Sequence, residues 1–127
     1  MMKTVSKFFL GLLAFSTFSQ GALAQSVSCA ATYCQYVGKI TRAYINEDNL
    51  MLIYFEEPFD VAITANAGIT GVSDGNAGSY IVTDNPDYSE FLYSTALTAL
   101  AADKTVTMQF YERRGSYLKI DKIWIYK

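Results

Sequence analysis

The later part of the chain changes its apolar spacing once, from a helical repeat to strict alternation. From Tyr88 onward apolar side chains recur three and four residues apart, which predicts an amphipathic helix. Asp84 and Asn85 precede it with short side chains that accept free backbone N–H groups, and Pro86 suits its first position. Residues 105–112 then alternate between apolar and polar side chains, which predicts a strand with one buried face.

The predicted helix is apolar on more than one side. Beside its main stripe runs a second stripe made by Tyr93, Leu97 and Ala101. A helix with so little polar surface packs against more than one neighbour. The second neighbour is either another part of the same domain or another subunit, and the pattern does not choose between them.

Other segments carry the signs of short strands separated by turns. Strands are predicted at 37–46, 50–57, 79–83 and 117–126, with a further short strand at 59–65 and a Gly-, Asn- and Ser-rich loop at 67–79. Gly38 indicates a bend or bulge in the first of these strands. In the last strand the apolar phase slips, and a bulge near Asp121 and Lys122 would reconcile its two halves.

The element order predicts a fold that is mainly β with one helix. Three strands, a helix and two strands in about one hundred residues are the order of an OB-fold. We therefore expect a five-stranded Greek-key barrel with its helix between strands 3 and 4. An open α+β sheet is the main alternative.

The chain begins with the pattern of a secretory signal peptide at residues 1–24. Lys3 and Lys7 precede an apolar run that is too short for a membrane span, and small residues Ala22 and Ala24 mark a cleavage site. An uncleaved anchor is the alternative. Cleavage would leave residues 25–127 as a single domain without a further membrane span, exported to the periplasm or secreted.

The charge balance bears on the partners that the exported domain would bind. Residues 1–24 hold two of the ten basic residues and none of the twelve acidic ones, so the remaining chain has a formal charge of −4. No run of basic residues is present. Neither nucleic acid nor anionic lipid is expected as a partner.

Two cysteines, Cys29 and Cys34, are separated by four residues. In an exported protein this pair most simply forms one local disulfide. The spacing differs from that of a redox CxxC pair, and two thiols in a chain without histidine cannot complete a zinc site. We expect a structural disulfide, no metal site and no cofactor.

Signatures of catalysis are missing from the sequence. It has no histidine, no GxSxG motif and no phosphate-binding loop, and the adjacent acids Glu56 and Glu57 fall on opposite faces of a predicted strand. We therefore expect no catalytic residue and no enzyme activity.

Three stretches resemble a known class of exported proteins. They are VGKI at 37–40, NPDYSEFLYSTALTALAADKTVTMQF at 85–110 and KIDKIWI at 119–125. Together they resemble the B subunits of AB5 toxins, particularly the pertussis- and subtilase-like branch. The resemblance implies a non-catalytic glycan-binding subunit that forms a homopentameric ring, binds a host glycan and has an enzymatic A subunit as partner. The chain departs from the class because its later strands lack cysteines, and no glycan-contacting motif carries over.

Tyrosines and arginines supply the candidate ligand-binding residues. Tyrosine has a flat face and a hydroxyl that suit a sugar ring, and arginine can bind a carboxylate such as that of sialic acid. The candidates are Tyr33 and Tyr36 beside the predicted disulfide, and Tyr111, Arg113, Arg114 and Tyr117 at the last hairpin. The alternative function is a stand-alone periplasmic or secreted OB-fold protein that binds a small ligand or another protein.

Overall fold

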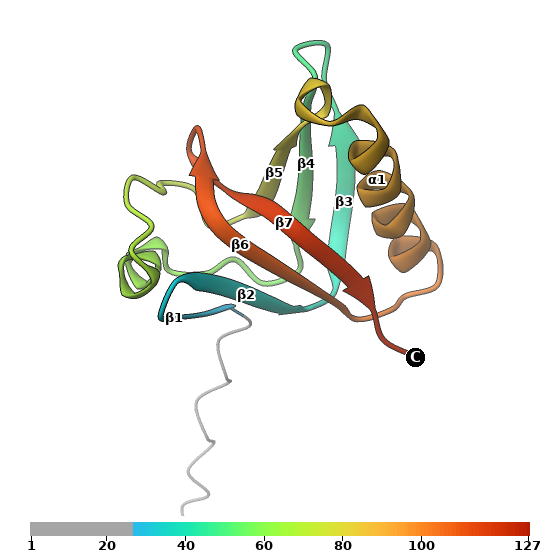
Figure 1. Ribbon diagram of the computed structural model, residues 1–127. Coiled ribbons are helices and arrows are strands. Elements are labelled where there is room, and N and C mark those ends of the chain that lie inside the picture. Colours follow the sequence, from blue (N-terminus) through green and yellow to red (C-terminus); the bar gives the residue numbers. More distant parts are fainter. Residues whose placement is uncertain (1–26) are drawn as a thin grey trace, which may run out of the picture.

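One mixed β-sheet and one α-helix make up residues 27–127, the part of the chain that the computed structural model describes (Figure 1). The strands are β1 (Val27–Ala30), β2 (Tyr33–Gly38), β3 (Ile40–Ile45), β4 (Leu50–Phe55), β5 (Ala77–Ile81), β6 (Val106–Arg114) and β7 (Tyr117–Ile125). Their order across the sheet is β1-β2-β6-β7-β5-β4-β3. Only β5 and β7 pair in parallel. The signal peptide predicted at residues 1–24 lies outside the described residues.

The predicted five-stranded closed barrel is wrong, because the sheet has seven strands and is open, with β1 and β3 at its edges. Two local features account for the difference. The segment before the predicted first strand forms a hairpin, β1–β2, and the strand predicted at 37–46 is divided at Lys39. Its first two residues belong to the end of β2, which pairs with β6, whereas residues 40–45 form β3, which pairs with β4. The helix, expected between strands 3 and 4, lies instead between β5 and β6.

The division at Lys39 is held by hydrogen bonds to its carbonyl oxygen. That oxygen accepts from the Tyr36 hydroxyl and from the backbone N–H of Glu56, the latter at 3.0 Å. A side chain at Gly38 would collide with the Tyr36 hydroxyl, since its Cβ would lie 2.5 Å from that oxygen. The bend predicted at Gly38 is thus present, and a register shift follows between Ile40 and Arg42.

The short strand predicted at 59–65 is instead a 3-10 helix, η1 (Val61–Ala67). Its ends carry local caps that outweigh the β-branched composition of the segment. The Asp60 carboxylate accepts from the backbone N–H of Ala62 at 2.9 Å, and Gly68 ends the helix in the left-handed region at φ 72°. A second short 3-10 helix, η2 (Val82–Asp84), connects β5 to the α-helix.

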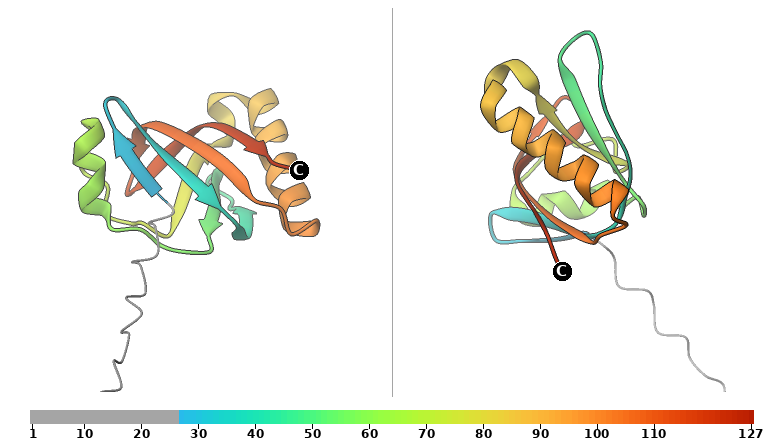
Figure 2. Two further views of the ribbon diagram at one scale, coloured as in Figure 1. Left: turned by 90° about the horizontal axis from the view of Figure 1, so that it is seen from below. Right: turned by 90° about the vertical axis from the view of Figure 1, so that its right-hand side faces the viewer.

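The α-helix, α1 (Pro86–Ala101), begins as predicted. The Asn85 side chain caps it by accepting from the backbone N–H of Tyr88 at 3.1 Å. Leu92, Ala96 and Ala99 are buried in the core. The helix lies beside the edge strand β3, and η1 lies on the opposite side of the molecule (Figures 1 and 2). A helix beside an edge strand hinders pairing with another sheet.

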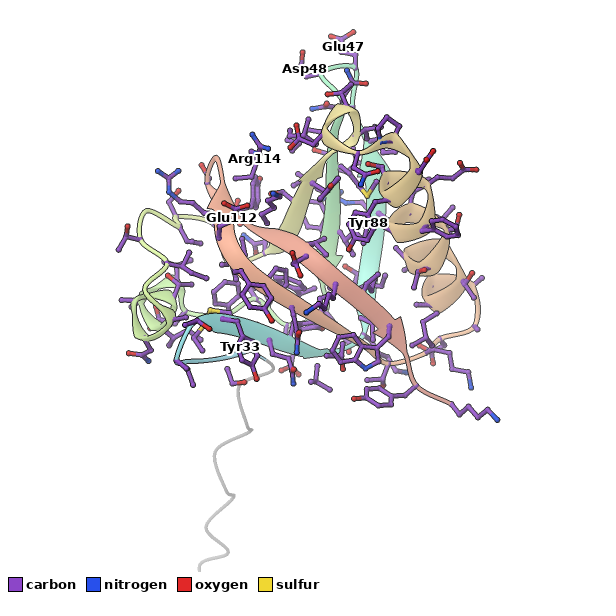
Figure 3. The ribbon with its side chains drawn as sticks, in the orientation of Figure 1. Tyr33, Glu47, Asp48, Tyr88, Glu112 and Arg114 are labelled. Atoms are coloured by element: carbon purple, nitrogen blue, oxygen red, sulfur yellow. A yellow bond between two sulfur atoms is a disulfide. The ribbon has the colours of Figure 1, made fainter. Side chains whose placement is uncertain are left out.

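The bulge predicted in the last strand is confirmed. Gln109 pairs with Lys122 whereas Phe110 pairs with Ile120, so Asp121 is an extra residue in β7. Its carbonyl oxygen accepts a hydrogen bond of 2.7 Å from the hydroxyl of Tyr88, which reaches from α1 toward β7 (Figure 3). The extra residue reverses which face each following side chain occupies.

The predicted disulfide joins Cys29 and Cys34, which lie opposite each other in the β1–β2 hairpin with 4.0 Å between their Cα atoms. Cys34 is fully buried in the core. Because the bridge closes only a short loop, we expect it to stabilise the fold by about 2 kcal/mol.

Candidate functional site

The strands β2, β6 and β7 present one side to the core and the other to solvent. We call the solvent side the outer face. The strand register and the burial pattern place Tyr33, Gln35, Val37, Gln109, Tyr111, Lys122 and Trp124 on it, together with Thr107, which is fully buried between Val37 and Trp124. Tyr126 follows directly after β7 and continues the same alternation. Large apolar side chains on this face are unusually exposed: Tyr33 36%, Val37 43%, Tyr111 41% and Tyr126 49%. Exposed apolar surface is typical of binding sites, so we take this face as the candidate site.

Tyr33 and Tyr111, both predicted as ligand-binding residues, lie side by side on the outer face. Their ring centroids are 5.6 Å apart and the rings are inclined by 32°. The ammonium group of Lys122 lies 5.2 Å from the centre of the Tyr111 ring and 3.5 Å from its hydroxyl. The ammonium group also lies 3.8 Å from the Asp121 carboxylate, which compensates part of its charge. This arrangement offers two aromatic faces and two hydroxyls to a ligand, beside a lysine that is already paired.

A pair of glutamines adjoins the tyrosines on the next rung of the sheet. Gln35 and Gln109 are direct partners in the β2–β6 register, and the Gln109 amide donates to the Gln35 oxygen at 3.0 Å. This contact holds both side chains in place. Within residues 27–127 nothing else binds the Gln35 nitrogen or the Gln109 oxygen, so one donor group and one acceptor are left for a ligand.

A hollow of about 370 Å³ borders Tyr111 and contains Arg113. Arg113 donates from Nη1 to the carbonyl oxygen of Gly115 at 2.9 Å, and no acid of the described chain pairs with it. Its side chain packs over Gly71, where a Cβ would lie 2.7 Å from Nε. The arginine is therefore held in position in a hollow that Tyr111 also lines, and no acid of the described chain compensates its charge.

Glu112 also lines the hollow, but its charge is neutralised. The Lys119 ammonium donates to its carboxylate at 2.7 Å, and this contact lowers the pKa of Glu112. The net positive charge of the hollow therefore comes from Arg113. A positively charged hollow suits a negatively charged group of a ligand.

The other three predicted residues lie elsewhere. Tyr36 is 1% exposed and stacks on Phe55 at 4.4 Å, so its ring belongs to the core and we do not include it in the candidate site. Arg114 forms an ion pair with Asp84 at the tip of the β6–β7 hairpin, far from Tyr33 (Figure 3). Tyr117 starts β7 on a different part of the sheet surface, next to Arg114.

Sequence reasoning missed Gln35, Gln109, Lys122 and Trp124. The glutamines alternate with core residues in their strands, which is a weak signal without the register that makes them partners. Lys122 and Trp124 reach the outer face only because Asp121 is an extra residue. The phase slip in the sequence was the one sign of this arrangement.

No group of three or more potential metal ligands occurs among residues 27–127. In the same part of the chain, no helix combines the length and the apolar character needed to cross a membrane. A scan against protein-family models, a search of curated proteins and a search of solved structures give no match to this chain.

Proposed function

We propose that this protein is an exported, non-catalytic glycan-binding protein, and that the outer face of β2, β6 and β7 binds the glycan. The observation that carries the proposal is the adjacent pair of exposed tyrosines, Tyr33 and Tyr111, beside the ordered glutamine pair. Aromatic rings cover the apolar face of a sugar, and the amides meet its hydroxyl groups in fixed directions.

The surroundings of the tyrosine pair favour a glycan that carries a carboxylate. Lys122 lies over the Tyr111 ring, Arg113 lines the same hollow as Tyr111, and Arg113 has no acidic partner among residues 27–127. A carboxylate that reaches the hollow would form charge-assisted hydrogen bonds with the guanidinium group. Arg114 is already paired with Asp84 and does not contribute.

The test is a glycan array with the oxidised protein, followed by affinity measurements on the best ligand. We expect Tyr111→Ala to weaken binding by about tenfold, the equivalent of roughly 1.4 kcal/mol. Arg113→Gln should weaken binding of carboxylated glycans more than of neutral ones. Tyr44→Ala is the matched control, since it removes a half-exposed tyrosine from β3 outside this face. Loss of binding in the control but not in Tyr111→Ala would contradict the proposed site.

We further propose that the chain assembles into a homopentameric ring, as its resemblance to toxin B subunits implies, and that an enzymatic A subunit is a possible partner. The support in the structure is a set of large apolar side chains on α1 and on the neighbouring strand that the domain leaves exposed. Phe91 is 73% exposed and Leu97 44%, and Ile45 on the neighbouring edge strand is 41% exposed. Burying these side chains against another copy would be favourable.

Light scattering on a sizing column measures this assembly directly. We expect a mass near five protomers for the wild type, and a shift to smaller species for Phe91→Glu with unchanged circular dichroism. Glu90→Gln changes the adjacent exposed position and should leave the mass unaltered. A monomeric wild-type protein would rule out the ring while leaving glycan binding to be judged by the array.

A further inference from the structure

An arginine and three tyrosines cluster on a second surface, formed by β3, β4 and the start of β7. The guanidinium of Arg42 lies 3.9 Å from the centre of the Tyr54 ring and 5.8 Å from that of Tyr44. The rings of Tyr44 and Tyr54 are 6.1 Å apart and nearly parallel, at 23°. Tyr117 adjoins them, and its pKa is raised by burial, by the Asp74 carboxylate and by these two tyrosines.

Arg42 is held in place without an acidic partner. None of the ion pairs or side-chain hydrogen bonds among residues 27–127 involves it. Stacking on Tyr54 fixes the plane of the guanidinium group and leaves its N–H edge for a ligand. An exposed arginine that is oriented but unpaired is suited to a carboxylate.

A nonpolar groove of about 380 Å³ continues from this cluster. It runs between the β3–β4 turn, which contains Asp48, and the tip of the β6–β7 hairpin, which contains Arg114 (Figure 3). Leu50 and Ile81 contribute aliphatic side chains to it, and Tyr117 forms a wall shared by the groove and the tyrosine cluster. Its lining consists largely of nonpolar atoms, which suits an aliphatic or aromatic side chain better than a sugar.

We propose that this surface binds an extended peptide segment of a partner protein, with a large apolar side chain in the groove and an acidic side chain on Arg42. The spacing follows from β4. Leu50 in the groove and Tyr54 under Arg42 are four residues apart in the same strand, which is roughly 13 Å. An extended peptide covers that distance in about four residues, so three residues separate the apolar and acidic positions. The tyrosine hydroxyls near the acidic position form hydrogen bonds with the peptide backbone.

The first acidic residue in the sequence is Glu47, so residues 1–46 do not contain the acidic position assigned to the peptide. The peptide surface is also separate from the outer face: Arg42, Tyr54 and Tyr117 belong to neither the tyrosine pair nor the hollow that contains Arg113. The proposed glycan site and the proposed peptide site can therefore be tested independently.

A peptide array tests the proposed spacing between the apolar and the acidic position of the peptide. It contains Leu or Phe separated from Glu by three varied residues, in both orders, and a matched set in which Gln replaces Glu. We expect the wild-type protein to bind the Glu peptides, with about tenfold weaker binding of the Gln peptides. Arg42→Gln should remove this preference. Arg113→Gln, which makes the same change outside the groove, should retain it.

Each result has a defined meaning. Equal binding of both peptide sets, no binding by the wild type, or an unaltered preference in Arg42→Gln would overturn the proposal. Binding of a uronic acid oligosaccharide that depends on Arg42 would also overturn it, because the surface would then be a second sugar site. Arg42 is exposed, so its substitution should leave thermal unfolding unchanged, and a lowered melting temperature would be detected before the array is read.

Discussion

Replacing Phe110 by alanine is expected to lower the free energy of unfolding by about 4 kcal/mol. The Phe110 side chain is fully buried, and its ring contacts Phe55 edge to face at 6.0 Å. It also lies against Gly78, where the ring leaves no room even for a methyl group. The cavity left by its removal would be surrounded by β-strands that are fixed in register, so it would collapse only in part. Urea unfolding followed by circular dichroism measures the loss.

Phe91→Ala is the matched control for this variant. It removes the same atoms from a side chain that is 73% exposed, so the isolated protomer should lose less than about 0.5 kcal/mol. If α1 packs against another copy, the control will show a loss that grows with protein concentration, whereas the loss in Phe110→Ala will not. Equal losses at high dilution would contradict the assigned core.

Raising the pH from 10 to 12 is expected to destabilise the fold by several kcal/mol. Burial raises the pKa of both Tyr36 and Tyr88 to about 12, from an ordinary value of 10. Below pH 10 both hydroxyls are protonated in the folded and unfolded states, and their contribution to stability is constant. Above pH 10 the unfolded chain releases these protons first, so the folded state loses stability until the folded pKa is passed. A tenfold difference in proton affinity between the two states corresponds to about 1.4 kcal/mol.

Unfolding in urea at a series of pH values measures this dependence. The Tyr88→Phe variant should lose less stability between pH 10 and 12 than the wild type, because one of the two groups no longer titrates. It should also be less stable at pH 8, since the hydrogen bond to the Asp121 carbonyl is lost. Tyr126→Phe is the control, since Tyr126 is exposed and the neighbouring Thr107 and Trp124 side chains lower its pKa rather than raise it, so removing this tyrosine should not reduce the loss of stability above pH 10. An identical pH dependence in Tyr88→Phe and wild type would contradict the prediction.

Local chemistry made parts of this fold predictable from sequence. Asn85 and Pro86 mark the start of α1, the alternation after residue 105 marks β6, and the short spacing of Cys29 and Cys34 permits one local bridge. Each of these signals acts over a few neighbouring residues. The structure confirms the elements that they predict.

The arrangement of the strands depended on contacts between distant segments. Whether a sheet closes is decided by which strand pairs with which, and element order does not determine that pairing. The division at Lys39 depends on a backbone bond from Glu56, which is remote in sequence. The prediction of a short strand at 59–65 was wrong for another reason. The cap from Asp60 favours a helical turn and competes with the strand propensity of Val61 and Ile63.

The candidate sites show the same limit. Tyr33 and Tyr111 could be selected by residue type, but their contact required the β2–β6 register. Tyr36 was selected by the same criterion and lies in the core, because residue type does not tell which face of a strand a tyrosine occupies. Arg42 had no sequence signal, since its role follows from stacking on Tyr54 in the adjacent strand.

The extra residue at Asp121 has an evolutionary consequence. Losing it would leave Ile120 next to Lys122 in regular alternation, so Ile123 and Ile125 would still face the core while Lys122 and Trp124 would still face solvent. The length of β7 is therefore less constrained at the bulge than within its paired halves, where an insertion or deletion would exchange the two faces. Homologues should tolerate the loss of this one residue as they tolerate changes of length in the loop around Asp74.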